Sequence, residues 1–207
     1  MFYRRFGKRF IDVVGSLLGL VFLSPVFLII SVLLLLTQGR PIFFVQSRPG
    51  FQGKAFNLYK FRTMTNAKNQ AGELLSNEER ITKIGLLLRK TSLDEIPELW
   101  NVLKGDMSLV GPRPLLFDYV PYYNDFQLQR HQVLPGITGL AQVHGRNALS
   151  WERRFEYDVE YLQSITLMKD IKILLKTISV VINREGVSDG EYISCEPFRG
   201  TPPNDQT

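Results

Sequence analysis

Hydrophobic and polar positions divide the chain into three parts. Residues 11–36 are almost wholly apolar, the middle of the chain alternates short apolar runs with polar turns, and residues 151–182 repeat apolar positions at helical spacing. These patterns predict a mostly helical α/β fold, with a membrane hairpin over residues 1–38 and a main domain over residues 39–185. From Asn183 onward the composition turns polar and rich in Gly and Pro, so we expect residues 186–207 to form a weakly ordered tail.

The apolar run at the start is long enough to enter a bilayer, since about 20 apolar residues cross its core as one helix. Ser24-Pro25 interrupts the run near its middle, where proline removes a helix hydrogen bond and kinks the axis. Basic residues flank the run on both sides, which favours keeping both ends in the cytoplasm. These basic residues are Arg4, Arg5, Lys8 and Arg9 before the run, and Arg40, Arg48 and Lys54 after it. We predict a reentrant helix-break-helix hairpin; periodicity alone favours a straight span with a mild kink.

Two aromatic-rich runs, residues 42–45 and 55–64, surround a Pro/Gly turn and predict a β-hairpin. Lys60 and Arg62 project from the same face of the second strand, so they are candidates to bind phosphates of a substrate, or else they form a solvated strand edge. Residues 79–90 predict a basic amphipathic helix, which could lie among lipid headgroups or face the core.

The second half of the chain is predicted to be mostly helical. Residues 117–132 indicate a helix that Pro121 either starts or breaks, and residues 133–147 indicate a functional loop or two short strands. The polar side chains of that loop are Gln142, Arg146 and Asn147. Two amphipathic helices follow, one from Trp151 to Leu162 and one from Met168 to Ile182, and their apolar stripes are predicted to belong to the core.

Composition and charge limit the binding partners and the cellular compartment that we expect for this chain. With 207 residues, a net charge of +5 and a pI near 9.3, the chain can form one domain with a real core and a basic surface. Beside the apolar segment, this basicity points to anionic lipids or phosphorylated substrates, and no nucleic-acid-binding motif is present. Cys195 is the single cysteine, so no intrachain disulfide can form, and no Cys/His cluster has zinc spacing. We expect a reducing, cytoplasmic setting.

The densest chemistry lies between residues 91 and 114. Ser92 is a natural N-cap with Glu95 three residues later, so the pattern predicts that Asp94 and Glu95 lie in the first turn of a short helix. Such a turn favours ionised carboxylates, which suits a nucleophile or a Mg²⁺ ligand. The plainer interpretation is that both residues only start a helix, with Pro97 in its first turn and Gly105 at its end.

Arg113 stands in a Gly-Pro-Arg-Pro sequence after this segment. Pro112 and Pro114 disfavour helix in the residue before each of them, so they should hold Arg113 in extended backbone. A guanidinium fixed in this way is a good bidentate partner for a phosphate group.

Several long motifs in a fixed order carry a resemblance that covers nearly the whole chain. They are KFRTM at 60–64, SLDEIP at 92–97, NVLKGDMS at 101–108, GPRP at 111–114, PGITGLAQV at 135–143 and FEYDV at 155–159, together with the Ser24-Pro25 break. With these motifs the chain resembles the bacterial sugar transferase family, and within it the small monotopic phosphoglycosyl transferases.

The resemblance implies an activity and roles for individual residues. Asp94 matches the family's nucleophile, which attacks the β-phosphate of a UDP-sugar, releases UMP and holds the phosphosugar until polyprenyl (undecaprenyl) phosphate accepts it. Glu95 matches the partner of the nucleophile, and Mg²⁺ is expected, with Asp94 as its ligand. Arg89, Arg113 and Lys60 are the expected phosphate-binding cations, and Arg62, Gln142 and Arg146 complete the set of candidate substrate-binding residues.

The resemblance also implies a location and partners. It places a monotopic catalytic domain at the cytoplasmic face of the bacterial inner membrane, at the first membrane step of glycoconjugate synthesis, with downstream glycosyltransferases as further partners. Likeness to the short members used in protein glycosylation favours an N-acetylated bacillosamine-type sugar, while galactose, glucose and N-acetylgalactosamine stay open. A non-catalytic membrane scaffold is the alternative from another class.

Overall fold

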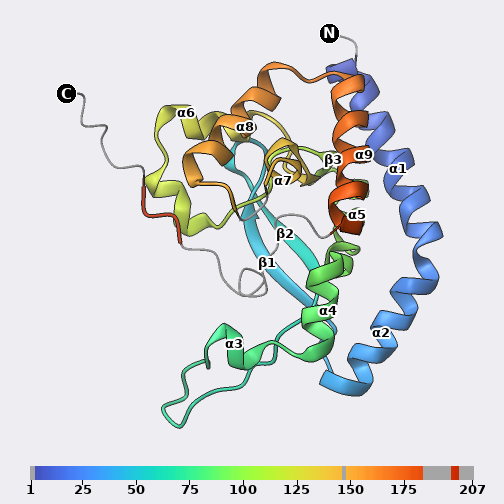
Figure 1. The fold of residues 1–207 in the computed structure, drawn as a ribbon, viewed down its shortest axis with the longest axis vertical. Helices are drawn as coiled ribbons and strands as arrows, with labels where there is room; N and C mark the ends of the chain where they lie inside the picture. The colour runs from blue at the N-terminus through green and yellow to red at the C-terminus, as the bar shows by residue number, and fades with distance from the viewer. Residues whose placement is uncertain (1–2, 146–147, 184–196, 201–207) are drawn as a thin grey trace.

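A computed structural model describes residues 3–145, 148–183 and 197–200. In these residues helices surround two small two-stranded sheets, and one long bent pair of helices runs along one side of the molecule (Figure 1). The predicted mostly helical α/β class is confirmed.

The bent pair forms the N-terminal part of the chain. A π-helical turn (Tyr3–Gly7) leads into α1 (Lys8–Phe22), and α2 (Ser24–Gln38) follows after a bend of 60°. Ser24 Oγ donates a hydrogen bond of 2.7 Å to the Val21 carbonyl at the bend, so the hydroxyl satisfies a carbonyl there. In the described residues no single helix is long and apolar enough to cross a membrane, whereas the bent pair together meets that length and composition. The predicted break at Ser24-Pro25 is therefore present in the structure.

The predicted β-hairpin is confirmed. Strands β1 (Phe43–Pro49) and β2 (Ala55–Phe61) pair antiparallel across a 3₁₀ turn (Phe51–Gly53), with Phe44 opposite Lys60. The Phe27, Phe43 and Phe61 rings pack together, with ring centroids 5.0–5.9 Å apart, and so join α2 to this sheet.

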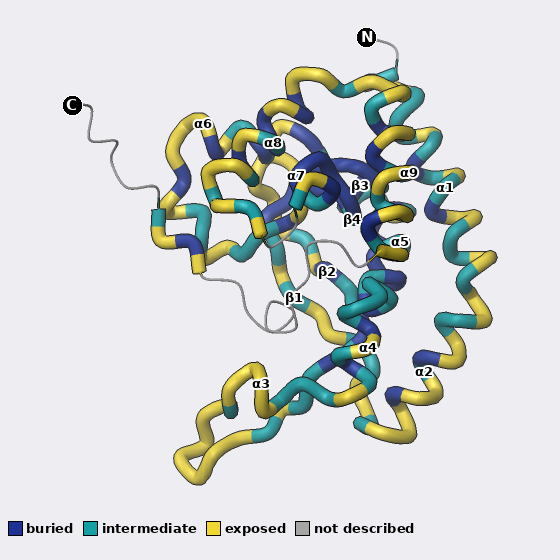
Figure 2. The backbone as a smooth tube through the Cα atoms, viewed as in Figure 1, coloured by how far each residue is buried: buried dark blue, intermediate teal, exposed yellow. Residues whose placement is uncertain are grey.

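The second sheet pairs β3 (Ser108–Val110) parallel to β4 (Gly136–Thr138). A Cβ atom on Gly136 would lie 2.1 Å from the Gly111 nitrogen, so the two backbones can approach only because glycine stands there. The loop predicted over residues 133–147 thus holds one strand and the short helix α7 (Leu140–Val143). β3, β4 and α7 lie in the most buried part of the tube in Figure 2.

Two predicted helices are broken. The helix expected over residues 79–90 is split into α3 (Asn77–Arg80) and α4 (Lys83–Thr91), because Ile81 is extended and the Thr82 side chain caps α4 by accepting from the Gly85 nitrogen. The helix expected over residues 117–132 consists of a 3₁₀ helix (Phe117–Tyr122), α6 (Asp125–Leu128) and a second 3₁₀ helix (Gln129–Gln132).

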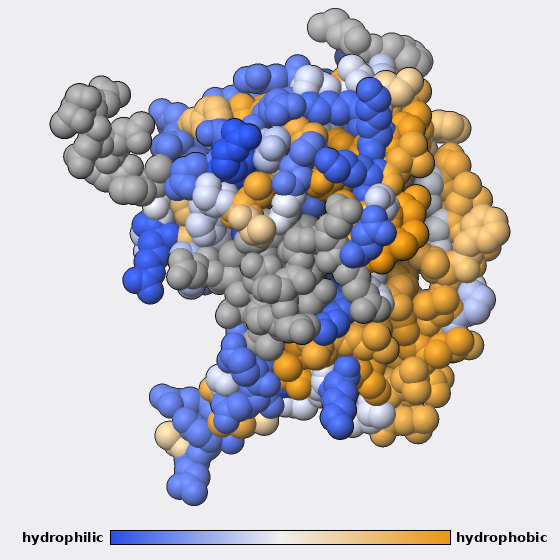
Figure 3. All heavy atoms as spheres, in the orientation of Figure 1, coloured by the Kyte–Doolittle hydropathy of each residue, from blue (hydrophilic) through white to orange (hydrophobic). Residues whose placement is uncertain are grey.

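The two C-terminal helices form as predicted, but only one hides its apolar stripe. In α8 (Trp151–Gln163) Phe155, Val159 and Leu162 are buried. In α9 (Leu167–Asn183) the stripe predicted to be core is exposed instead, with side chains between 40% and 72% accessible: Met168, Ile171, Leu175, Ile178 and Ile182. Helical periodicity defines an apolar face but not what covers it. With the outer faces of α1 and α2, this stripe forms the orange side of the molecule in Figure 3.

Only residues 197–200 of the predicted tail are described. Phe198 is buried and packs against Tyr119, Tyr123, Trp151 and Phe155, so the segment 197–200 is held by an aromatic cluster. The other residues of the stretch 186–207 lie outside the described part of the chain.

Candidate active site

The acidic pair lies in a tight turn between two helices. Asp94 and Glu95 belong to a 3₁₀ turn (Leu93–Glu95) that joins α4 to α5 (Glu98–Lys104), and α5 ends at Gly105 with a φ of +97°. Ser92 holds the N-cap position of this turn and both acids lie in its first turn, as predicted. The predicted side-chain cap is absent, because Ser92 adopts a left-handed conformation with a φ of +57° and closes α4. Its nitrogen donates to the Arg89 carbonyl, and its side chain caps no helix.

Glu95 is held by two cations that come from distant parts of the chain. Its Oε1 atom accepts hydrogen bonds from Lys60 Nζ of β2 at 2.6 Å and from Arg113 Nη2 at 2.5 Å. Lys60 Nζ also lies 3.1 Å from Oε1 of Glu98, in the first turn of α5. The structure therefore brings Lys60, Glu95 and Arg113 together, as expected from the sequence, and adds Glu98.

Burial and these cations set the electrostatics of the cluster. Burial alone would raise the pKa of Glu95, but Arg113 and Lys60 outweigh it and hold this pKa well below its ordinary value. Burial raises the pKa of Glu98 to about 7, an effect that Lys60 only partly offsets. Glu95 therefore stays ionised throughout the physiological range.

Asp94 has a different environment from its neighbour. Its side chain is buried, with 8% of the residue accessible. Within the part of the chain that the structure describes, no hydrogen bond or ion pair engages its carboxylate. Burial raises the pKa of Asp94 to about 6, and Lys60 counteracts this rise. Asp94 is therefore a mostly ionised, unoccupied carboxylate at neutral pH, which is what a nucleophile requires.

Arg89 lies in the last turn of α4, just before the turn that holds the acidic pair. Its Nε atom donates to Thr63 Oγ1 at 3.0 Å, which orients the guanidinium. Burial lowers the pKa of Arg89, and the charges of Asp94 and Glu95 offset part of this effect. Arg89 therefore lies within electrostatic range of both carboxylates.

The residues present fit a Mg²⁺ ion only together with a phosphorylated ligand. Mg²⁺ is usually bound by one or two carboxylates plus substrate phosphates and water. Asp94 offers such a carboxylate, whereas Glu95 is occupied by two cations. Among the described residues, no group of three or more His, Cys, Asp or Glu side chains could hold a metal.

The other predicted substrate-binding residues lie outside the charged cluster or outside the described part of the chain. Arg62 is not in the cluster, because its Nη2 atom donates to the Gln38 and Gly39 carbonyls and so caps the end of α2. Gln142 lies in α7 with both polar atoms of its amide buried and unpaired among the described residues. Arg146 falls outside the described part of the chain.

Sequence reasoning missed Glu98 and Thr63. The signal for Glu98 was available, since it follows Asp94 by four residues and Glu95 by three, a spacing that places side chains on one face of a helical segment. Nothing in the pattern around Thr63 indicates its contact with Arg89.

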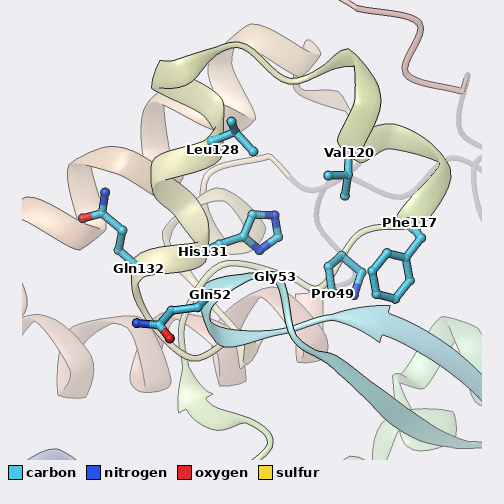
Figure 4. A pocket seen from close by; sticks show the side chains of 8 residues that line it. All are labelled: Pro49, Gln52, Gly53, Phe117, Val120, Leu128, His131 and Gln132. Atoms are coloured by element: carbon cyan, nitrogen blue, oxygen red, sulfur yellow. The ribbon is translucent and has the colours of Figure 1, made fainter.

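One cavity lies away from the acidic pair, near the tip of the β-hairpin. It measures about 290 Å³, and the ring of His131 projects into it between Pro49 and Leu128 (Figure 4). A second cavity of about 10 Å³, the size of one water molecule, shares His131 and extends to Arg113. Asp94, Glu95 and Lys60 line neither of these two cavities.

Comparison with known proteins agrees with the family resemblance that the sequence motifs indicate. The family model described as "Bacterial sugar transferase" matches residues 3–184. The "Uncharacterized sugar transferase EpsL" of Bacillus subtilis is 49% identical over 194 residues, which is 94% of this chain and 96% of that protein.

Other relatives are longer than this chain. The "Undecaprenyl-phosphate galactose phosphotransferase" of Salmonella typhimurium is 42% identical over 88% of this chain, and the "UDP-glucose:undecaprenyl-phosphate glucose-1-phosphate transferase" of Klebsiella pneumoniae is 39% identical over 83% of it. The matches cover only 42% and 39% of those two proteins. The extent of the family match and the full-length likeness to the Bacillus protein show that the chain belongs to the bacterial sugar transferase family.

Proposed function

We propose that this protein transfers a sugar 1-phosphate from a UDP-sugar to undecaprenyl phosphate and releases UMP. The observation that carries the proposal is the contrast within the acidic pair: Glu95 is paired with two cations, while the buried carboxylate of Asp94 has no hydrogen-bond or ion-pair partner among the described residues. The names of the Salmonella and Klebsiella relatives support the same class of reaction.

The chemistry consists of two displacements at one phosphorus atom. A carboxylate oxygen of Asp94 attacks the β-phosphorus of the UDP-sugar, and the bond from that phosphorus to the bridging oxygen breaks, so that UMP leaves with the oxygen. A terminal oxygen of undecaprenyl phosphate then attacks the same phosphorus and releases the Asp94 carboxylate. The products are UMP and a sugar diphospholipid, with no oxidation or reduction.

The cations explain why a carboxylate can approach a diphosphate. Like charges repel, so the phosphate oxygens must be neutralised before attack, and Lys60, Arg89 and Arg113 are the candidates for this role. The Arg113 side chain contacts Glu95 and is 45% accessible, so it can reach an incoming phosphate. Mg²⁺ held by Asp94 and the phosphate oxygens would supply further charge neutralisation.

We infer a UDP-hexose donor. Galactose and glucose are the sugars in the names of these relatives, and none of those names mentions a bacillosamine-type sugar. The sequence-based preference for the bacillosamine-type donor therefore has no support from the comparisons, and UDP-galactose and UDP-glucose are the donors to test first.

We also propose that the protein is seated on the cytoplasmic face of the membrane by the bent pair α1–α2 acting as a reentrant hairpin. Most large exposed apolar residues of the molecule lie on α1, α2 and α9 and gather on one side (Figure 3). A surface of this kind suits contact with lipid, and the acceptor is itself a lipid.

The test uses the full-length protein in detergent with undecaprenyl phosphate, Mg²⁺ and a panel of UDP-sugars. We expect UMP to form in step with a sugar diphospholipid for a UDP-hexose, and Asp94→Asn to abolish both products. Absence of UMP with every donor would contradict the proposal and favour a non-catalytic scaffold. Arg153→Gln, a change in an exposed side chain of α8, is the control that should keep activity.

A further inference from the structure

One face of α1 carries charged side chains that contact the main domain. Arg9 and Asp12 lie on this face about one helical turn apart, while Phe10 and Val14 project outward. An anchor that only inserts in lipid needs apolar residues, and charged groups in such a segment usually have a separate function.

Arg9 binds the end of the helix that follows the acidic pair. Its Nη1 and Nη2 atoms donate to the Val102 and Leu103 carbonyls at 2.6 and 2.8 Å, in the last turn of α5. A guanidinium at a helix C-terminus pairs with carbonyls that lack partners within the helix. Since α5 begins with Glu98, three residues after Glu95, Arg9 fixes the far end of a short rigid element of the active site.

Asp12 binds the strand that leads to Arg113. Its Oδ1 atom accepts hydrogen bonds from Ser108 Oγ and from the Leu109 nitrogen, both at 2.9 Å, and the Asp12 residue is buried. β3 ends at Val110, and Arg113 follows three residues later. Asp12 therefore fixes the backbone from which the guanidinium bound to Glu95 projects.

The same face continues along α1 with close packing. A Cβ atom on Gly15 would lie 2.7 Å from Leu109 Cδ1, and one on Gly19 would lie 3.1 Å from Leu99 Cδ1. Leu109 belongs to β3 and Leu99 to α5. The two elements that Arg9 and Asp12 bind by hydrogen bonds thus also pack against glycines of the same helix.

We propose that Arg9 and Asp12 are positioning residues for the transfer reaction: by holding α5 and β3 on one face of α1, they set the position of Arg113 relative to the acidic pair. The inference rests on the proposed function. A misplacement of about 1 Å far from the chemistry can reduce a rate by about 100-fold, so loss of either contact should slow the attack on phosphorus.

The test compares Asp12→Ala, which removes the acceptor, with Asp12→Asn, which keeps an oxygen that can accept both hydrogen bonds. Both are assayed as full-length protein in detergent micelles, where seating in a bilayer is not needed. We expect kcat per folded protein to fall about 10- to 100-fold in Asp12→Ala with the donor KM changed less than about threefold, and Asp12→Asn to restore most of kcat. Val14→Ala, on the outer face of the same helix, should match wild type.

Arg9→Met provides a second variant in case Asp12→Ala does not fold, and it should show the same loss of kcat. Wild-type kcat in folded Asp12→Ala or in Arg9→Met would overturn the proposal, as would an Asp12→Asn variant as slow as Asp12→Ala. A wild-type protein that releases no UMP from any donor would contradict the proposed function itself, and is thereby distinguished from a failure of the positioning role.

Discussion

Two neighbouring carboxylates take different roles because of what surrounds each side chain. Glu95 projects toward Lys60 and Arg113, which keep it ionised and occupied. Asp94 is buried without such a partner among the described residues, and its raised pKa reflects that burial. Only the adjacency of the two acids is visible in the sequence, so assigning the nucleophile from local pattern alone was impossible and depended on the family resemblance.

Glu98 should make stability depend on pH. Burial raises its pKa to about 7 in the folded state, from 4.5 in the unfolded chain, so the unfolded state loses the proton first. Folding stability from this group therefore decreases as pH rises from about 4.5 to 7. The Glu98→Gln variant has no ionisable group at this position. At pH 8 in metal-free buffer its Tm should exceed that of wild type, by about 2–4 °C for each kcal/mol by which its free energy of unfolding is larger.

Thermal melts of both proteins at pH 5 and pH 8 check this effect. The advantage of Glu98→Gln should be small at pH 5 and larger at pH 8. An equal difference at both values would show that the carboxyl group of Glu98 does not titrate in this range.

At the scale of elements, periodicity predicted α8 and α9, and proline and turn residues predicted the Ser24-Pro25 break and the β-hairpin, because each has a strong local signal. It could not show that the α9 stripe faces outward, since a pattern does not state what covers it. The capping signal at Ser92 located the turn of the acidic pair correctly, but the side-chain cap does not form because the same residue closes the preceding helix. Arg62 caps α2 through contacts 23 and 24 residues away, which no local pattern reveals.

The bend between α1 and α2 should decide topology. Pro25→Ala, or Ser24→Ala with Pro25→Ala, restores a helix hydrogen bond and favours a continuous helix. We expect a fraction of the variant molecules to span the membrane, so that an N-terminal tag becomes accessible to reagents outside intact spheroplasts. Wild type and Leu28→Ala should keep the tag protected, and labelling of the wild-type tag would contradict the reentrant hairpin.

At the scale of the whole molecule, apolar side chains gather on one side, and the charged cluster is the proposed binding site of the soluble donor. α9 adds its exposed stripe to that side, so it should strengthen membrane binding independently of the hairpin (Figure 3). Leu175→Ser with Ile182→Ser should reduce the fraction that floats with lipid vesicles by several-fold. Phe126→Ser removes an exposed apolar residue from α6 and should float like wild type. Equal flotation of all three proteins would remove α9 from the membrane surface.

The central claim is that Asp94 carries the phosphosugar before the lipid acceptor takes part, and a donor-only reaction tests it most directly. Protein, Mg²⁺ and UDP-sugar without undecaprenyl phosphate should release UMP in an amount no greater than the amount of protein, and mass spectrometry should find a phosphosugar on the peptide that contains Asp94. Asp94→Asn should abolish both signals. Release of UMP only when undecaprenyl phosphate is added, or an adduct that survives Asp94→Asn and disappears with Glu95→Gln, would contradict this account.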